Sequence, residues 1–405
     1  MVSYKEAINI ALQSAQKKKK SEVVTIEEAL YRVLSEDIYA VRDLPPFNNS
    51  AMDGYVFSYS QKEKKLKIID TILAGDHKER RVNDGECCKI MTGAKVPESC
   101  DSVIPVELAA IEGDYLIVNQ DIKKGNAVRL KGEELRKGER ILKAGELLSP
   151  AKIALLASQG IVKVSVFKKL TVAIASTGNE LKEPHEEASE GEIYNINAIN
   201  IKMHLKALGF DADYLGTIPD NLEGSIKFIE QFKQYDVAIT TGGVSKGDAD
   251  YTEKAFLVNG LNELFKGIKV KPGHPTLFGM MEHTFVMAMP GNPLAAIVNI
   301  LLLGVPVLCK LQGREETFYK TCRVRMAKEL RLKPGRANIV LGNLKDGSFY
   351  PYKNNKYGSG MISPLAQSDA IVLFGEDKSF IEEKSEIEAV LLNQIHFTQH
   401  LKYIN

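Results

Sequence analysis

Apolar strand-like runs alternate with helical patterns through residues 170–311, and this alternation limits the possible folds of the 405-residue chain more than any other feature. Short apolar runs separated by helices are typical of a parallel sheet that is covered on both faces. The sequence therefore predicts a central α/β domain. The expected strands are 170–175, 214–218, 237–240, 268–270 and 285–289, and the expected helices are 198–208, 222–232, 252–258 and a segment after Pro293.

The segments on either side of this domain have different patterns. Residues 40–138 contain short β-rich stretches between turn residues, near 67–73, 101–108 and 114–118, as in an all-β lobe. The tail from Glu315 alternates again and carries turn signals, so we expect a small C-terminal β-barrel. The prediction is a multidomain α/β protein with four parts: a discontinuous helical linker domain (1–43 and 139–168), a β-rich lobe (44–138), the α/β domain (169–313) and the C-terminal barrel (314–405).

Capping signals predict the first helices of the linker domain. Ser3 and Glu6 form a capping box, which begins a helix that we expect to end in the lysine run 17–20. Thr25 and Glu28 repeat this signal and predict a second short helix. The lysine run fits a solvated helix end better than a nucleic-acid patch, because cations favour the negative end of a helix dipole.

A later segment of the linker domain carries stronger signals. Ser149 is a favourable N-cap, and Pro150 follows it at the first helical position. Gly160 stands where a glycine commonly ends a helix. The sequence therefore predicts a helix over 150–158.

Charge and composition exclude several classes of protein. The 53 Lys and Arg residues nearly balance the 52 Asp and Glu residues, so no overall field favours nucleic acid or an anionic membrane. The longest apolar run, 295–308, is interrupted by Asn299, Gly304 and Pro306, and we expect no membrane span. The five cysteines show no repeated spacing, which predicts neither a disulfide framework nor a thiolate zinc site. We expect a reduced, cytoplasmic protein.

Segments rich in Gly, Pro and acids follow the five predicted strands of the α/β domain. Ligands of open parallel sheets bind beyond the carboxyl ends of the strands, so these segments are candidate binding loops. Glycine lets a backbone approach an anion, and a following helix offers free N–H groups. Ordinary strand-to-helix turns use the same residues, but five such segments on one rim favour a ligand cleft. The segments are 176–180, 219–220, 241–250, 271–275 and 290–293.

These loops do not match the common nucleotide motifs. Residues 242–247 have the glycine spacing of a Walker A loop, but Asp248 follows where Lys is required, which excludes a P-loop nucleotidase. No Gly-x-Gly-x-x-Gly follows a strand. The acids Glu180, Asp220, Asp248 and Asp250 indicate either Mg²⁺ held near a phosphate or a general acid or base. Asp220 fits an N-cap of the next helix equally well.

A second candidate cluster lies far away in the sequence. Residues 45–55 and 91–97 are rich in polar and turn residues, yet they include apolar side chains such as Phe47. This composition is typical of a packed loop that presents functional side chains, here Asp53 and Thr92. A purely structural loop explains the same pattern, so both interpretations stay open.

Five motifs occur together in this chain: Pro-Pro-Phe-x-Asn-Ser-Ala-Met-Asp-Gly-Tyr (45–55), Thr-Gly-Ala-x-x-Pro (92–97), Ser-Thr-Gly-x-Glu-Leu (176–181), Thr-Gly-Gly-Val-Ser-x-Gly-x-x-Asp-Tyr (241–251) and Pro-Gly-Asn-Pro (290–293). In this order they resemble the molybdopterin molybdenumtransferases, the MoeA family that includes the gephyrin E domain. The resemblance covers nearly the whole chain. It implies a central domain of the molybdopterin-binding type and an enzyme that inserts molybdate into adenylylated molybdopterin, with Mg²⁺-dependent release of AMP.

The resemblance also implies an assembly and a set of site residues. It implies a homodimer with the active site between subunits, and transient contacts with other molybdenum cofactor biosynthesis proteins. The implied catalytic residues are Asp53, Thr92, Glu180, Asp220, Asp250 and Lys271, of which Asp53, Glu180 and Asp250 would hold the metal. The implied pterin-binding and anion-binding residues are Ser176, Thr177, Gly178, Gly242, Gly243, Ser245, His274, Pro290, Gly291, Asn292, Pro293 and Ser359.

The chain departs from the family pattern at a few positions. His274 replaces a Lys, Leu341 replaces an Arg, Ala295 replaces a common Ser and Asn48 replaces an Asp. The lost Lys and Arg look like cations that hold molybdate, and a neutral imidazole and a Leu provide much less positive potential. Two rival functions therefore remain: a pterin-binding scaffold with weak or no insertion activity, and a molybdopterin adenylyltransferase. The extra flanking lobes argue against the second rival.

Overall fold

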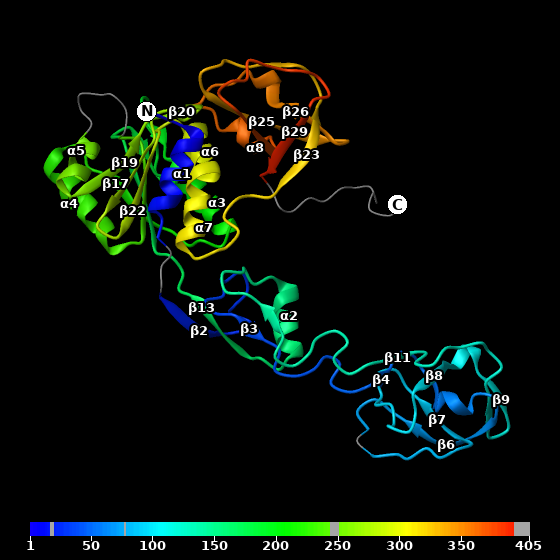
Figure 1. The fold of residues 1–405 in the computed structure, drawn as a ribbon. Coiled ribbons are helices and arrows are strands. Elements are labelled where there is room, and N and C mark those ends of the chain that lie inside the picture. Colours follow the sequence, from blue (N-terminus) through cyan, green and yellow to red (C-terminus); the bar gives the residue numbers. More distant parts are fainter. Residues whose placement is uncertain (17–19, 77, 244–250, 393–405) are drawn as a thin grey trace.

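The computed structural model describes residues 1–16, 20–76, 78–243 and 251–392. Its parts form an elongated molecule (Figure 1). The central α/β domain and the C-terminal domain lie side by side at one end, and the β-rich lobe lies at the other end. The linker domain separates the lobe from the central domain.

The central sheet has six strands, of which four are parallel. The parallel strands are β17 (Asp213–Ile218), β14 (Val172–Thr177), β18 (Val237–Thr241) and β22 (Thr284–Met289), in this order across the sheet. The antiparallel strands β21 (Leu277–Met281) and β19 (Leu261–Lys266) extend the sheet beyond β22. The predicted parallel core is confirmed, whereas this antiparallel edge was not predicted.

Helices cover both faces of the central sheet (Figure 1). Side chains of β14 alternate between two apolar cores, with Val172 and Ile174 in one and Ala173 and Ala175 in the other. The first core contains α1 (Tyr4–Ser14), α3 (Ile196–Ala207), α6 (Pro293–Asn299) and α7 (Val305–Leu311), and the second contains α4 (Leu222–Glu230) and α5 (Tyr251–Val258). A strand buried on both faces is what the continuous apolar runs predicted.

One predicted strand belongs to a different sheet. Residues 268–270 were expected in the central sheet, but β20 (Ile268–Lys271) pairs with β25 (Ala337–Lys345) of the C-terminal domain and with β1 (Val2–Ser3). A run of four residues carries too little pattern to identify its partner, because strand pairing is set by contacts distant in sequence. The loop that follows β20 is therefore held between two domains.

The apolar segment after Pro293 is a longer helix than the sequence suggested. The interruptions expected at Asn299, Gly304 and Pro306 do not break it, because a π-helical turn (Ile300–Gly304) joins α6 to α7. Within the described residues, Pro293–Leu311 is the one helix that is long and apolar enough to cross a membrane, and 94% of it is buried inside the protein. It is thus a core helix, and burial rather than length argues against a membrane span.

The linker domain confirms one predicted helix and corrects another. Helix α2 (Pro150–Ser158) has Ser149 as its N-cap, and Gly160 follows with φ of 73°. Thr25 and Glu28 make the expected capping hydrogen bonds, but the chain turns instead of forming a helix. The left-handed backbone of Tyr31 (φ 58°) is incompatible with a second helical turn.

Two strand pairs join the separated parts of the linker domain. Strand β2 (Ser21–Thr25) pairs with β13 (Lys163–Phe167), and β3 (Ile38–Tyr39) pairs with β12 (Arg140–Leu142). Helix α1 lies outside this domain and ends at Ser14, before the predicted lysine end, whose residues 17–19 lie outside the described part of the chain. Its Tyr4 hydroxyl donates a hydrogen bond to the carbonyl oxygen of Leu302 at 2.6 Å, so α1 packs on the central domain.

The two β domains have separate cores. In the lobe, the strand order is β8 (Ser102–Pro105), β5 (Gly54–Phe57), β7 (Glu86–Ile90), β6 (Lys65–Ile72), β10 (Tyr115–Ile117) and β9 (Ala110–Glu112). In the C-terminal domain, β25, β26 (Ser348–Pro351), β23 (Thr321–Met326), β29 (Glu386–Leu391) and β27 (Ala370–Phe374) close into a ring. Pairing of β25 with β27 closes this ring and confirms the predicted small barrel.

All five cysteines are free thiols, and Cys322 alone is not fully buried. Burial raises the pKa of Cys87 and of Cys100 to about 12, so both thiols stay protonated and unreactive near neutral pH. These features agree with the expected lack of a disulfide framework.

Candidate functional site

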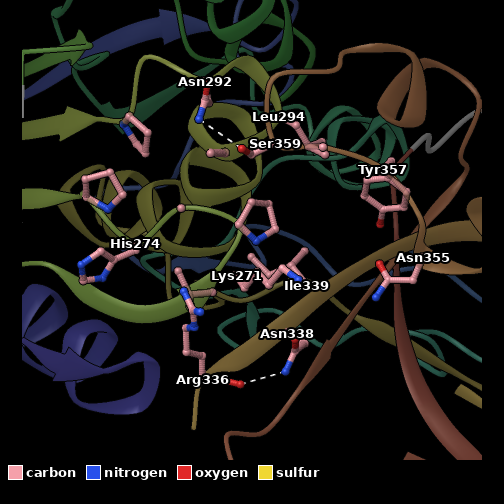
Figure 2. A pocket seen from close by; sticks show the side chains of 17 residues that line it. Lys271, His274, Asn292, Leu294, Arg336, Asn338, Ile339, Asn355, Tyr357 and Ser359 are labelled. Atoms are coloured by element: carbon pink, nitrogen blue, oxygen red, sulfur yellow. Dashed lines mark hydrogen bonds between the residues drawn. The ribbon is translucent and has the colours of Figure 1, made fainter. Parts of the chain in front are cut away.

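A cavity of about 330 Å³ lies between the central domain and the C-terminal domain (Figure 2). We call it the interdomain pocket. No Asp or Glu of the described residues lines it, and two exposed cations, Lys271 and Arg336, do. Its other polar lining residues are His274, Asn292, Asn338, Asn355, Tyr357 and Ser359.

The loop after β20 forms one wall of this pocket. Gly273 has φ of 113°, and an added Cβ would lie 2.4 Å from Nδ2 of Asn299, a fully buried residue of α6. That amide nitrogen donates to the carbonyl oxygen of Gly273 at 2.8 Å and to the hydroxyl of Thr276 at 2.7 Å. Only glycine fits this close approach, and the two bonds fix the loop that presents Lys271.

His274, in the loop after β20, is held by the backbone of that strand. Its Nδ1 lies 2.9 Å from the carbonyl oxygen of Ile268, which can only accept, so Nδ1 carries the proton. The ring edge packs beside Gly267, where an added Cβ would be 3.4 Å from the imidazole. The structure places His274 at the pocket wall in a structural contact with β20.

Leu341, expected beside the oxyanion, does not line the pocket. Its side chain is 1% exposed and belongs to the apolar core shared by the two domains. Its backbone N–H donates to the Tyr357 hydroxyl at 2.8 Å, and burial raises the pKa of Tyr357 to about 12. The sequence interpretation missed Arg336, Asn338, Asn355 and Tyr357 as lining residues. The turn signal at 333–335, directly before Arg336, was the one local indication.

Three loops at the carboxyl ends of the central strands come together beside the pocket. An added Cβ on Gly242 (φ 82°) would lie 2.2 Å from the Thr177 hydroxyl, and one on Gly291 would lie 3.7 Å from Cα of Gly242. The carbonyl oxygen of Gly291 accepts from Asn197 of α3 at 2.7 Å. The expected residues Ser176, Thr177, Gly178, Gly242, Gly243, Pro290, Gly291, Asn292 and Pro293 all lie in these adjoining loops or in the strand and helix ends that border them.

The three loops form the rim of the central sheet, and Asn292 and Ser359 join this rim to the C-terminal domain. The amide of Asn292 donates to the Ser359 hydroxyl at 3.1 Å, and the N–H of Leu294 donates to the Ser359 carbonyl oxygen at 3.1 Å. This contact places Ser359 against the start of α6 (Figure 2). The strand loops and the interdomain pocket therefore form one continuous site.

A hydrogen-bond network behind the rim orients Ser176. The Ser176 hydroxyl donates to Oδ1 of Asn195 at 3.1 Å. The amide of Asn195 donates to Glu183 at 3.0 Å and to the Tyr214 hydroxyl at 2.7 Å, and Tyr214 donates to Glu183 at 2.6 Å. Burial, followed by the bond to Glu183, raises the pKa of Tyr214. The sequence analysis did not identify Asn195, Glu183 or Tyr214.

The predicted acids are only partly described. The Glu180 carboxylate folds over Gly178, where an added Cβ would lie 2.7 Å from it, and Asp220 accepts from the Asn179 amide at 2.9 Å. The N-cap of α4 is Asn221 rather than Asp220, so the capping alternative for Asp220 is wrong. Ser245, Asp248 and Asp250 lie outside the described residues. Among the residues with described positions, no group of three or more His, Cys, Asp and Glu is close enough to hold a metal.

Asp53 and Thr92 meet each other in the lobe. One carboxylate oxygen of Asp53 accepts from the Thr92 N–H and from its hydroxyl, each at 2.7 Å. These bonds lower the pKa of Asp53, which is exposed. The lobe lies at the far end of the molecule (Figure 1), so one chain does not bring this pair together with the rim loops.

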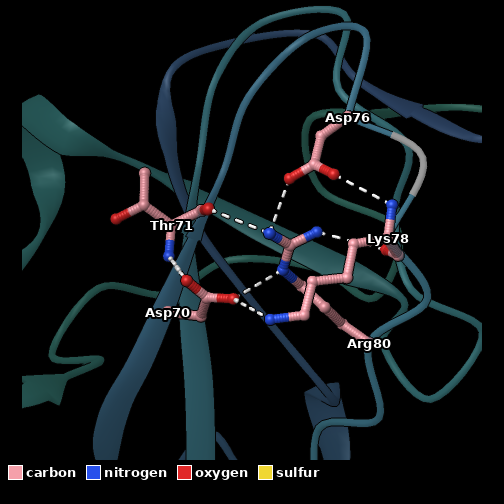
Figure 3. Close-up of polar contacts among 5 residues, drawn as sticks. All are labelled: Asp70, Thr71, Asp76, Lys78 and Arg80. Carbon is pink, nitrogen blue, oxygen red and sulfur yellow. Dashed lines mark hydrogen bonds and ion pairs between the residues drawn. The ribbon is translucent and has the colours of Figure 1, made fainter.

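The lobe also contains a second basic pocket, of about 450 Å³, which is lined by Lys78, Arg80, Arg81 and Lys95 together with Asp76, Glu79 and Glu98. Its centre is Arg80, whose Nε donates to Asp70 at 2.8 Å and whose Nη2 donates to Asp76 at 2.6 Å (Figure 3). The guanidinium also donates to the carbonyl oxygens of Lys78 and Thr71, so four of its five N–H donors are already used. We call Arg80 and the residues that it bonds, Asp70, Thr71, Asp76 and Lys78, the Arg80 cluster. The role of this cluster is structural.

The fold and the site define a class of protein: a multidomain α/β protein with glycine-bearing strand loops beside a cationic pocket. Three consecutive family models match the chain: the MoeA N-terminal region (domain I and II) at residues 2–160, a probable molybdopterin binding domain at 173–310, and the MoeA C-terminal region (domain IV) at 323–392. The chain belongs to the MoeA family of molybdopterin molybdenumtransferases.

Individual relatives support this assignment. The chain is 36% identical over 300 residues to a molybdopterin molybdenumtransferase of Haemophilus influenzae, covering 73% of this chain and 74% of the relative. It is 28% identical over 415 residues to one of Staphylococcus epidermidis, covering 99% and 98%. A crystal structure of the molybdopterin biosynthesis moeA protein from Pyrococcus horikoshii OT3 superimposes with a TM-score of 0.85 at 29% identity, covering 96% of this chain and 100% of that one.

Proposed function

We propose that this chain inserts molybdate into adenylylated molybdopterin and releases AMP in a Mg²⁺-dependent step. The observation that carries the proposal is the junction of the glycine-bearing rim with a pocket that holds two exposed cations and, among the described residues, no acid. The relatives are named for molybdenum transfer, and their N-terminal, central and C-terminal regions are all matched here. An adenylyltransferase alone would not explain the flanking regions.

The two parts of the site have different roles in this proposal. The loops with Ser176, Thr177, Gly178, Gly242, Gly243 and Pro290–Pro293 bind the phosphates and pterin of the substrate, because their backbones allow close approach of an anion. Ser245 would extend this set. The interdomain pocket binds molybdate, with Lys271 as the cation contributed by the central domain and with Ser359 and His274 in its walls.

The exposed carboxylates of Glu180 and Asp220 fit a Mg²⁺ site, since this ion commonly uses one or two carboxylates together with substrate phosphates and water. Asp250, and Asp53 from a second subunit, complete the proposed ligands and catalytic acids. When bound, Mg²⁺ neutralises charge that develops on the phosphate oxygens as the anhydride is cleaved. Lys271 positions the incoming anion, and Thr92 orients the Asp53 carboxylate through the two hydrogen bonds described above.

The direct test follows AMP after incubation with adenylylated molybdopterin and Mg²⁺, with and without molybdate. Molybdate-dependent release is expected. Binding without release would instead support the second candidate, a pterin-binding scaffold. The specific observation in its favour is that His274 bonds the backbone of β20 through Nδ1 and Leu341 packs in the core, so neither position carries the Lys or Arg of the family pattern.

We also propose that the site is shared between the subunits of a homodimer. The separation of Asp53 and Thr92 from the rim within one chain supports this arrangement, because a partner lobe would supply them. Contacts with other molybdenum cofactor biosynthesis proteins, which would deliver the pterin in the cytoplasm, belong to the same proposal.

Complementation tests the shared site. Asp53→Ala and Lys271→Ala are each expected to be inactive as homodimers. In a mixed dimer one site combines both substitutions and the other has neither, so random mixing should restore about a quarter of wild-type AMP release. Absence of recovery, with mixed dimers shown to form, would contradict a shared site.

A further inference from the structure

We propose that Arg336 supplies the second positive charge of the oxyanion pocket, in place of the cations that the family pattern has at His274 and Leu341. Arg336 would thus contact molybdate directly, together with Lys271 of the neighbouring strand. This inference rests on the proposed function and names the residue that makes the anion site of this chain effective.

Arg336 and Lys271 reach the pocket from neighbouring strands that pair at the domain junction, where Lys271 of β20 lies opposite Asn338 of β25. Lys271 ends β20 on the central-domain side, and Arg336 directly precedes β25 of the C-terminal barrel. Figure 2 shows the Arg336 side chain extending toward Lys271. Within the described part of the chain, neither side chain makes an ion pair or hydrogen bond with protein, and no acid lines the pocket. Two unpaired cations that converge in an acid-free cavity are a receptor for a dianion.

The backbone that presents Arg336 is held firmly. The amide of Asn338, a residue 4% exposed, donates to the Arg336 carbonyl oxygen at 2.8 Å and to the Lys333 carbonyl oxygen at 3.1 Å. The N–H of Gly335 (φ 87°) donates to the carbonyl oxygen of Glu376 at 2.9 Å. These bonds fix the turn at 333–335, so the base of the Arg336 side chain keeps its position without a ligand.

The two positions where the family pattern has a cation are less suited to this role. Nδ1 of His274 is bonded to the Ile268 carbonyl oxygen, so that nitrogen is not available to an anion. The Leu341 side chain is in the core. A guanidinium presents a planar array of N–H donors, which suits two oxygens of a tetrahedral oxyanion. The charge lost at two positions of the family pattern is therefore restored from a third position, directly before β25.

The experiment measures binding of molybdate alone to the full-length protein by equilibrium dialysis, and AMP release separately. Arg336→Gln is expected to weaken molybdate binding by about 10- to 100-fold, because a charge-assisted contact is removed. Arg331→Gln is the matched control: it makes the same charge change at an exposed position of the same domain, outside the pocket, and should stay within about twofold of wild type. Thermal unfolding of each variant verifies the fold.

A conservative variant tests the charge argument. Arg336→Lys keeps the charge and loses the planar array, so it should bind molybdate more tightly than Arg336→Gln. Wild-type binding by Arg336→Gln, or equal binding by the Lys and Gln variants, would overturn the inference. Molybdate binding that depends on Arg336 without any AMP release by the wild-type protein would contradict the proposed function while the assignment of Arg336 stands.

Discussion

Two basic pockets in this molecule differ in what their cations contact. The Arg80 cluster lies in the larger cavity, but Asp70 and Asp76 occupy its central guanidinium and further acids line the walls. The interdomain pocket is smaller and has fewer cations, yet no described acid lines it. An incoming anion would have to displace carboxylates in the first pocket and only water in the second.

This difference indicates how an anion site can be recognised. Cations without an acidic partner identify it better than the number of cations or the cavity volume does. Arg80 fixes the loop that begins after β6, since it joins Asp70 of that strand to Asp76 of the loop (Figure 3). Lys271 and Arg336 lie on backbones that other residues fix, namely Asn299 and Asn338. Their charges are therefore left for a ligand.

The largest effect expected from this comparison concerns Lys271. Lys271→Gln should reduce kcat/KM for molybdate by about 100-fold or more, because one of two unpaired charges is lost from a pocket that no described acid lines. Lys78→Gln makes the same charge change in the Arg80 cluster and should leave the rate within about twofold. Steady-state AMP release at varied molybdate concentration measures both. Equal losses in the two variants would remove the distinction between the pockets.

An intermediate effect is expected on the stability of the lobe. Arg80→Met should lower its unfolding temperature by roughly 5 °C, because two carboxylates lose their partner. The hydrogen bonds from Arg80 lower the pKa of Asp70 and Asp76, so this stabilisation is present above the unfolded value of about 3.9 and is lost as pH falls through the folded values. Calorimetry at pH 7 and pH 3 should show a difference between variant and wild type that shrinks at the lower pH.

Molybdate binding provides the control for this variant. Arg80→Met should bind molybdate as wild type does, since the anion site lies in another domain. Weakened binding, or a stability difference that is constant with pH, would contradict a purely structural Arg80.

The smallest effect concerns the network behind Ser176. Tyr214→Phe removes the hydroxyl that bonds Asn195 and Glu183, and it should lower kcat for AMP release by about 3- to 10-fold while the KM for molybdate stays unchanged. This split would separate orientation of the rim from anion binding. Tyr350→Phe, at an exposed residue of the barrel, is the matched control. A raised KM with unchanged kcat would mean that the network supports the anion pocket instead.

Local signals predicted the parts of the fold that depend on neighbouring residues. Ser149, Pro150 and Gly160 identified α2 with its bounds, because capping and left-handed backbone are properties of a few adjacent positions. Thr25 and Glu28 show the limit of this approach: the capping bonds form, but Tyr31 and the pairing of β2 determine the chain path. Strand 268–270 was recognised as a strand, while its partners are distant in sequence and could not be predicted.

The residues of the candidate site also fall into a part that the sequence could predict and a part that it could not. Glycine-bearing loops after strands were predictable, because parallel strands bring their carboxyl ends to one edge. The roles of Arg336 and Leu341 were not, since both lie along β25 or just before it, and only the docking of the barrel on the central domain decides which of them faces the cavity. A motif comparison placed a cation at position 341, where this chain has core packing instead.

The placement of α1 on the central domain has a consequence for biosynthesis of the protein. Its Tyr4 bonds Leu302, and its Leu12 carbonyl oxygen accepts from Lys310 of α7, so each pair spans 298 positions of the sequence. At translation rates of about 5–20 residues per second, the ribosome takes roughly 15–60 s to make that intervening chain. During this interval the apolar face of α1 cannot yet pack against α7. A chaperone that binds nascent chains therefore has time to cover this face.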